Sequence, residues 1–116
     1  MPNNQDIELD QLFSALADPT RRAVVQMLVE KQNASVSELH APHAMALPSF
    51  TQHLKVLEDA GLISTRKQGR VRMVNIEAQT LTKAQKWLEH QRKVWEARFD
   101  RLDALLSKDH KEGDDT

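Results

Sequence analysis

A polar segment and a basic segment follow one another near the middle of the chain. The polar segment, residues 48–60, carries five side chains that can form outward hydrogen bonds: Ser49, Thr51, Gln52, His53 and Lys55. The basic segment, residues 64–75, carries four cationic side chains: Arg66, Lys67, Arg70 and Arg72. Glutamine can pair with the edge of adenine, hydroxyl groups reach bases or phosphates, and Lys and Arg neutralise phosphates. These residue types therefore indicate binding of double-stranded DNA.

The positive charge of this region is local. From Pro48 to Ile76, five Lys and Arg residues stand against two acidic ones, whereas the whole chain of 116 residues has a net charge of −1. A charged hairpin or a polar helix face, taken alone, is more often a solvated surface than a binding site. The two features in consecutive segments favour nucleic acid over that simpler alternative.

The hydrophobic spacing predicts elements that hold the two segments together. A helix over residues 48–60 has three apolar residues on its inner face: Phe50, Leu54 and Leu57. Gly61 suits a left-handed cap at the end of that helix. From Ile63 the spacing changes to the alternation of a two-stranded hairpin, with a tight turn at Gly69. The helix and the basic hairpin are therefore expected side by side on one surface.

Three shorter helical patterns precede this pair. The first begins at Ile7 and stops near Asp18-Pro19, where an aspartate N-cap and a proline at the first helical position start the second. A short third helix is expected to begin at Ser35 or Ser37. Helices in this order, the last two at helix-turn-helix spacing, followed by a basic hairpin, predict a winged helix. The fold class is thus mainly α with a small β-hairpin.

The last helix has a seven-residue apolar repeat. Leu81, Leu88, Trp95 and Leu102 recur every seven residues, with Phe99 and Leu106 four beyond the last two. Such a seam packs one helix against another, either within the chain or against a second copy. About 30 residues of helix are roughly 45 Å long, more than a small winged domain can cover. A homodimer is therefore expected. The predicted organisation is a disordered N-terminus (1–6), a winged DNA-binding domain (7–77), a dimerisation helix (78–107) and a disordered acidic tail (108–116).

Other classes of function lack their usual residues. The chain has no cysteine, which removes disulfides, thiolate metal sites and a cysteine nucleophile. His40 and His43 are three residues apart, but Pro42 between them disrupts the geometry of a metal pair. No glycine-rich phosphate loop or nucleophile elbow is found, so no catalytic residue, metal or cofactor is expected. No signal sequence or apolar run of membrane-spanning length is found either, and a cytoplasmic protein is expected.

Four stretches resemble a known family of regulators. LADPTRRAVVQML, SVSELH, LPSFTQHLKVLEDAGLI and RKQGRVRMVNI are similar to the ArsR-like (arsenic-repressor type) winged helix-turn-helix transcriptional regulators. The resemblance runs from about Leu12 to Ile76 and continues into the last helix. It implies a homodimeric repressor that reads an inverted repeat through helix 48–60 and wing 64–75. It also implies that the first helix, at Leu9 and Leu12, joins the last helix in the dimer interface.

The chain departs from the metal-sensing members of that family. The third-helix region has no thiol, and His90 is the sole histidine of the last helix as far as Ser107. The sequence therefore resembles a subgroup without a metal site. A small-molecule effector stays open, with an aromatic cavity or ordinary packing as alternatives for four residues of the last helix: Trp87, Val94, Trp95 and Phe99. The alternative function is a winged-helix module that binds proteins and not DNA.

Overall fold

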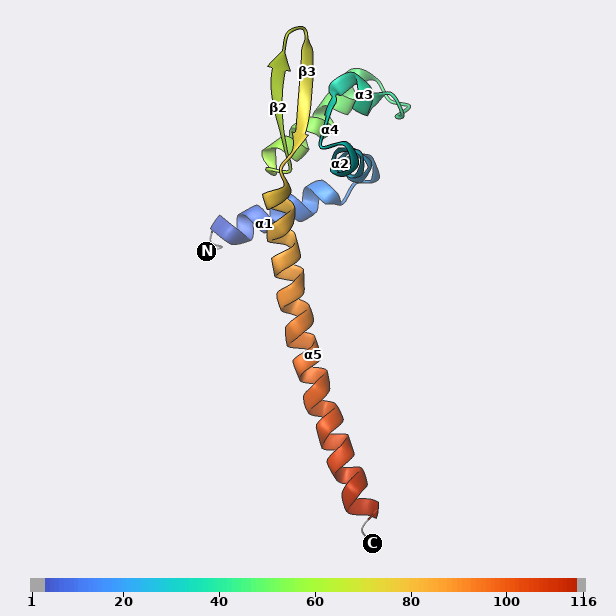
Figure 1. Cartoon of the computed structure of the whole chain (residues 1–116), viewed down its shortest axis with the longest axis vertical. Helices are drawn as coiled ribbons and strands as arrows, with labels where there is room; N and C mark the ends of the chain where they lie inside the picture. Colours follow the sequence, from blue (N-terminus) through green and yellow to red (C-terminus); the bar gives the residue numbers. More distant parts are fainter. Residues whose placement is uncertain (1–3, 115–116) are drawn as a thin grey trace. The chain divides into compact units, whose positions relative to one another are not determined.

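The chain forms two units, residues 1–84 and residues 85–116. The computed structural model describes the backbone of residues 4–114 and the side chains of residues 8–107. The first unit contains four helices, a three-stranded sheet and the beginning of a fifth helix (Figure 1). The second unit consists of the remainder of that helix. The predicted fold class, a mainly α winged helix-turn-helix with a long C-terminal helix, is confirmed.

Helices α1 (Asn4–Leu16) and α2 (Pro19–Lys31) meet at Asp18, as the sequence predicts. The Asp18 side chain accepts a hydrogen bond of 3.0 Å from the backbone N–H of Arg21, and Pro19 occupies the first helical position. This is the geometry of an N-cap followed by proline. Helix α1 begins at Asn4, earlier than the predicted start at Ile7. Residues 1–3 of the predicted disordered N-terminus lie outside the described residues.

The sheet has one strand more than the predicted hairpin. Strand β1 (Asn33–Ser35) pairs with β3 (Val71–Ile76), which also pairs with β2 (Ile63–Gln68), so the antiparallel order is β1-β3-β2. The prediction of a two-stranded hairpin is corrected here. Ala34 lies opposite Val74, and both are buried. A strand of three residues is too short to show alternation in the sequence, and its partner lies far along the chain.

Helix α3 (Val36–His40) begins with a capping box. The Ser35 hydroxyl accepts from the backbone N–H of Glu38, and the Glu38 carboxylate accepts from the backbone N–H of Ser35. This bond from the Ser35 backbone lowers the pKa of Glu38 below its ordinary value. The predicted helix start at Ser35 is therefore confirmed, with Ser35 as the cap.

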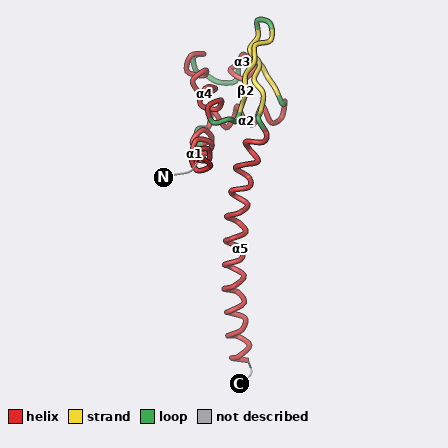
Figure 2. The backbone as a smooth tube through the Cα atoms, turned by 90° about the vertical axis from the view of Figure 1, so that its left-hand side faces the viewer, coloured by secondary structure: helices red, strands yellow, loops and turns green. Residues whose placement is uncertain are grey.

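Helix α4 (Leu47–Asp59) packs its apolar face into the centre of the first unit. Phe50 and Leu57 are fully buried together with Leu28 of α2 and Leu39 of α3. Helix α4 also contacts β2, while α2 contacts β3, and Figures 1 and 2 show the β2–β3 hairpin beside α4. The helix begins and ends within one residue of the predicted range 48–60. The core therefore fixes the inner face of α4 and leaves its polar face outward.

Helix α5 (Ala78–Asp114) starts inside the first unit. Ala84 is buried, the Thr80 hydroxyl donates to the Gly61 carbonyl at 2.6 Å, and Lys83 pairs with Glu8 of α1 at 3.5 Å. The helix ends at Asp114, beyond the predicted end at residue 107. The predicted disordered tail is corrected to that extent, and residues 115–116 lie outside the described residues. None of the described helices is long and apolar enough to cross a membrane.

Candidate nucleic-acid interface

The outward face of α4 carries the predicted polar side chains. Four of them are exposed: Ser49, Thr51, Gln52 and Lys55. The hydroxyl proton of Thr51 is given to the Leu47 carbonyl at 2.7 Å, which leaves its oxygen lone pairs and its methyl group outward. Lys55 lies 4.0 Å from Asp59, one turn on, an exposed pair of small energetic weight. A base edge or a phosphate can therefore reach all four side chains.

The predicted glycine cap joins α4 to the hairpin. Gly61 has φ +76°, its backbone N–H donates to Glu58, and the N–H of Leu62 donates to Leu57 at 3.0 Å. These two bonds form a Schellman motif, in which the residue after the helix takes a left-handed conformation. Leu62 is fully buried beyond the cap. The chain thus reverses direction within two residues and enters β2 beside the helix that it has just left.

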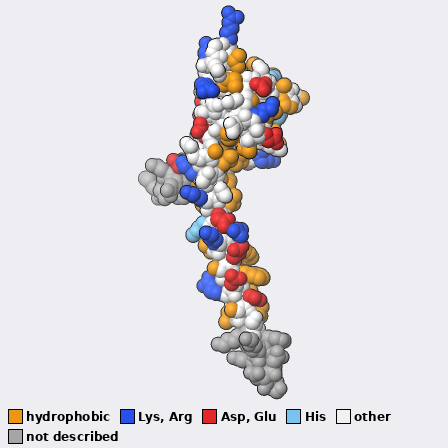
Figure 3. Space-filling model, in the orientation of Figure 1, with side chains coloured by type: hydrophobic (Ala, Val, Ile, Leu, Met, Phe, Trp, Pro, Cys, Tyr) orange, Lys and Arg blue, Asp and Glu red, His pale blue; other side chains and the backbone are white. Residues whose placement is uncertain are grey.

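The predicted wing, residues 64–75, lies within the β2–β3 hairpin and presents its basic side chains near the tip. Gly69 has φ +66° in the two-residue loop between Gln68 and Val71, as the sequence predicts. Arg66, Lys67 and Arg70 are exposed, and they have no ion pair within the described part of the chain. Lysine and arginine atoms gather over the tip in Figure 3. Such side chains are available for phosphate groups.

The fourth basic residue of the wing, Arg72, is tied to α4. Its guanidinium Nη1 donates to the Thr65 hydroxyl at 2.9 Å, and that hydroxyl donates to the Glu58 carboxylate at 2.9 Å. Arg72 also lies directly opposite Lys67 in the hairpin, where like charges repel. An anion at this face would relieve the repulsion. These two hydrogen bonds link Glu58 of α4 through Thr65 to Arg72 of the wing, a connection that the sequence did not reveal.

His53 is less exposed than the other polar residues of α4. Its Nδ1 atom lies 3.1 Å from Nη1 of Arg21, and its side chain is 24% exposed. The same arginine donates through Nε to the Ala15 carbonyl at 2.7 Å and through Nη2 to the Ser14 carbonyl at 3.1 Å. Arg22 donates to the Leu16 carbonyl at 2.8 Å. The two arginines therefore donate to three carbonyl groups at the end of α1, of which the Ser14 carbonyl also accepts from the backbone N–H of Ala17.

Asp18 lies on the other side of this junction. The bond from the backbone N–H of Arg21 lowers the pKa of the Asp18 carboxyl below its ordinary value of 3.8. Its Oδ2 atom lies 3.7 Å from Nδ1 of His53, which is an ion-pair distance only for a protonated ring and is too long for a hydrogen bond. Arg21 at 3.1 Å is therefore the hydrogen-bond partner of His53.

His40, at the end of α3, and His43, in the turn before α4, flank Phe50. Their rings lie 5.1 and 5.4 Å from the Phe50 ring, and Nε2 of His40 lies 2.7 Å from the Met45 carbonyl. Because a carbonyl oxygen only accepts, His40 carries its proton on Nε2. The two histidines thus close the turn between α3 and α4. Within the described residues, no three His, Cys, Asp or Glu side chains are grouped as a metal site would require.

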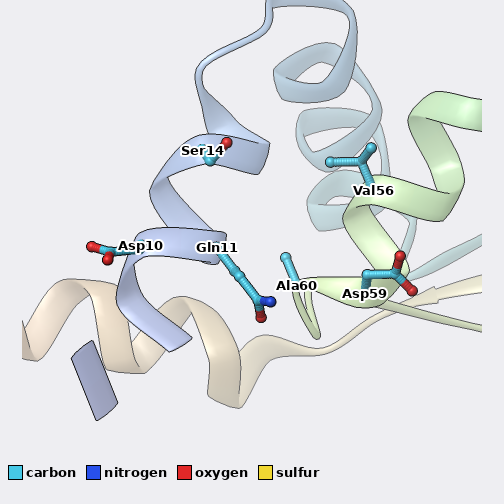
Figure 4. A pocket seen from close by; sticks show the side chains of 6 residues that line it. All are labelled: Asp10, Gln11, Ser14, Val56, Asp59 and Ala60. Carbon is cyan, nitrogen blue, oxygen red and sulfur yellow. The ribbon is translucent and has the colours of Figure 1, made fainter. Parts of the chain in front are cut away.

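A hollow of about 380 Å³ opens between α1 and α4. Figure 4 shows the side chains that line it, three from α1 and three from the end of α4: Asp10, Gln11, Ser14, Val56, Asp59 and Ala60. None of its lining residues is among the four residues of the last helix considered for an effector cavity. Of those four, Val94, Trp95 and Phe99 are more than half exposed. An effector site on that helix stays a prediction.

The predicted dimer residues fall into three groups by exposure. Leu12 is 2% exposed inside the core of the first unit, and its place at a dimer interface stays a prediction. Leu9 and Leu81 are half-buried, and Leu81 packs against the same core. The remaining five side chains of the predicted interface are exposed: Leu88, Trp95, Phe99, Leu102 and Leu106. Leu105, which falls outside the seven-residue repeat, is exposed beside them.

Several known proteins are similar to the chain in sequence or in structure. A family model described as a helix-turn-helix domain matches residues 16–66. The uncharacterized HTH-type transcriptional regulator YuzN of Bacillus subtilis is 31% identical over 87 residues, which cover 69% of this chain and 95% of that protein. The arsenical resistance operon repressor of Escherichia coli is 38% identical over 60 residues, 52% of this chain and 51% of that protein, so the chain spans about half of its length.

A solved structure extends the similarity to most of the fold. The crystal structure of an ArsR family transcriptional regulator, RHA00566, is 49% identical in sequence and superposes with a TM-score of 0.74. The similar region covers 83% of this chain and 97% of that one.

Proposed function

This chain belongs to the ArsR family of helix-turn-helix transcriptional regulators, and from that premise we propose that it is a homodimeric repressor of a promoter with an inverted-repeat operator. The family consists of DNA-binding regulators and not of enzymes, which confirms the prediction that the chain is not an enzyme. Repression is proposed because relatives carry that name, among them the arsenical resistance operon repressor. The site of action is then the cytoplasm, where a bacterial promoter would lie.

The observation that carries the proposal is one surface shared by α4 and the wing. The exposed polar side chains of α4 and the basic side chains of the wing come from consecutive elements, which the Gly61 cap and the Glu58–Thr65 bond hold together. We propose that α4 enters the major groove and that the wing binds the backbone beside it. Gln52 would pair with adenine, Ser49 and Thr51 would reach bases or phosphates, and Arg66 and Arg70 would neutralise phosphates.

Two copies are proposed because one helix and one wing make few phosphate contacts. Such a site has weak affinity that falls steeply with salt. Joining two copies raises the effective concentration of the second, so that both half-sites are read together. The exposed apolar stripe of α5 supports this arrangement, since the side chains of Trp95 and Leu102 face solvent in a single chain. Half-sites about one helical turn apart follow from a rigid dimer.

The competing function is a winged helix that binds proteins and not DNA. A protein-binding module would not need the basic wing. Neutralising the wing should therefore leave partner binding intact for such a module, but should weaken binding of DNA. In the triple variant Arg66→Gln, Arg70→Gln, Arg72→Gln, DNA binding should weaken on every sequence and the salt slope should flatten. Gln52→Ala should instead relax the preference at one base position.

The experiment that tests the proposal is selection of bound duplexes from a random pool, followed by titration of the selected duplex with each variant. The control is Lys86→Gln with Lys93→Gln, which removes two positive charges from exposed positions of α5 outside the proposed interface with DNA. An inverted repeat should be enriched, the wing variant should bind at least tenfold more weakly at moderate salt, and the control should bind as the parent does. Failure to enrich any sequence, with binding to all duplexes unaffected by the wing variant, would contradict the proposal.

A further inference from the structure

All three guanidinium nitrogens of Arg21 in α2 have a polar contact. Nε and Nη2 donate to the Ala15 and Ser14 carbonyls at the end of α1, and Nη1 lies 3.1 Å from Nδ1 of His53 in α4. Two of these bonds hold the arginine against a rigid helix end, so the third nitrogen has a fixed position. One side chain thus connects the end of α1 with the reading helix.

The protonation of the His53 ring follows from that contact. A guanidinium group is always charged in proteins and can only donate hydrogen bonds. Nδ1 of His53 must therefore accept, which places the ring proton on Nε2 of a neutral imidazole. The nearest carboxylate, Asp18, does not offer Nδ1 an alternative partner, because its Oδ2 atom is 3.7 Å away and already accepts from the Arg21 backbone.

The Nε2 atom of His53 is open to solvent. No hydrogen bond is made to it within the described residues, and none of the described side chains has a buried nitrogen or oxygen without a partner. Since His53 is itself only partly exposed, an Nε2 atom without a partner must reach the surface. His53 directly follows Gln52, one of the four exposed polar residues of α4.

We propose that Arg21 is a positioning residue that fixes the tautomer of His53, so that His53 offers the duplex a hydrogen-bond donor and no acceptor. The inference rests on the proposed entry of α4 into the major groove. There a donor matches guanine N7 or O6, adenine N7 or thymine O4, whereas the amino group of cytosine, itself a donor, is rejected. Arg21 therefore determines specificity at one operator position without touching DNA.

The matched variants are Arg21→Met and Arg22→Met. Both remove one positive charge and one set of bonds to the end of α1, but only Arg21 contacts His53. A role limited to capping α1 would make the two variants alike. The variant His53→Ala has two uses. Its loss of base preference identifies the operator position that His53 reads, and its missing signals identify the resonances of the His53 ring.

The first measurement is the pair of ring ¹⁵N chemical shifts of His53 in the free protein. The parent and Arg22→Met should show an unprotonated Nδ1 and a protonated Nε2, and Arg21→Met should show a mixture of tautomers. A protonated Nδ1 in the parent would overturn the proposal, and this result does not depend on any variant folding. Identical ring shifts in both arginine variants would overturn it as well.

The second measurement is competition among duplexes with each base at the position that His53 reads. The parent and Arg22→Met should bind the cytosine duplex about fivefold more weakly than the best base, and Arg21→Met should lose this difference. Equal loss in both variants would assign the effect to α1 and overturn the proposal. If the parent bound no duplex, the proposed function would fail and the base preference with it, whereas the ring shifts would still report the tautomer.

Discussion

The first unit, residues 1–84 (the winged unit), buries large apolar side chains, whereas the remainder of α5 exposes side chains of the same kind. Phe50 and Leu57 of α4 are 0% exposed, whereas Trp95 and Phe99 of α5 are 65% and 60% exposed. In the winged unit, α1, α2, α3, α4 and the sheet all contribute buried side chains to one core. Along residues 85–107 the large apolar side chains of α5 are exposed, and Figure 3 shows hydrophobic and charged groups intermixed on this part of the helix. The first unit thus completes its own core, whereas the apolar stripe of α5 offers a surface suited to the proposed second copy.

The largest difference is expected when one large apolar side chain is removed from each region and the free energy of unfolding is measured. Phe50→Ala is expected to lower the free energy of unfolding by about 3–5 kcal/mol, because it leaves a cavity in the core. Phe99→Ala, measured by the same denaturant titration, should cost less than about 0.5 kcal/mol at protein concentrations where the chains are dissociated. A large loss in the dissociated Phe99→Ala protein would mean that this side chain is covered within its own chain.

Charging the stripe should have the next largest effect. The double variant Trp95→Glu, Leu102→Glu is expected to be monomeric and to bind the selected duplex about a hundredfold more weakly, because the two half-sites lose their linkage. The control, Ala97→Glu with Ala104→Glu, adds the same charge on another side of the helix and should stay dimeric. Sedimentation velocity and duplex titration measure both quantities. Equal dissociation in the two double variants would argue against the stripe as the interface.

A smaller effect on duplex affinity is expected from breaking the hydrogen bonds between the wing and α4. Thr65→Val keeps the shape of the side chain but removes the bonds to Glu58 and Arg72, so duplex affinity should fall about fivefold as the wing loses its orientation. Thr82→Val is the matched control, because the Thr82 hydroxyl bonds only to the Ala78 carbonyl of its own helix. Titration of the selected duplex measures the affinity of each variant. Similar affinities for Thr65→Val and Thr82→Val would show that the Thr65 bonds do not support DNA binding.

The smallest predicted effect is the pH dependence of the winged unit. The pKa of Asp18 is lowered in the folded chain, so its contribution to stability is present above the ordinary value of 3.8 and is lost as the pH falls through the lowered pKa. Asp18→Asn, which still caps α2, should flatten this acid loss, and Asp18→Ala should cost about 1 kcal/mol at neutral pH. Denaturant titrations from pH 7 to pH 3 test both. An acid loss of unchanged size in Asp18→Asn would assign it to other carboxyl groups.

The sequence predicted the features that local chemistry determines. Gly61 and Gly69 adopt positive φ as expected, since few other residues tolerate that conformation. Asp18 before Pro19 likewise starts α2, because the cap and the proline act within one turn. The apolar face of α4 followed from the spacing of its residues alone. These parts required no knowledge of distant segments.

The features that escaped prediction depend on distant segments. Strand β1 exists because Ala34 meets Val74, and neither residue announces the other in the sequence. The family resemblance placed Leu12 at a dimer interface, whereas its burial in the core of the first unit depends on segments that are distant in the sequence. The contacts of Arg21 and of Thr65 join side chains to partners fixed only by the tertiary fold. For the candidate site, the residue types and the adjacent placement of α4 and the hairpin were therefore predictable, whereas the side-chain contacts that join distant segments were not.

The number of chains bound to one selected duplex tests the central claim most directly. Sedimentation equilibrium of the parent protein, alone and with the duplex, measures that number. We predict two chains in the free protein and two on each inverted repeat, with a single half-site bound far more weakly. One chain in solution and one chain per duplex, at unchanged affinity when a half-site is deleted, would contradict the account.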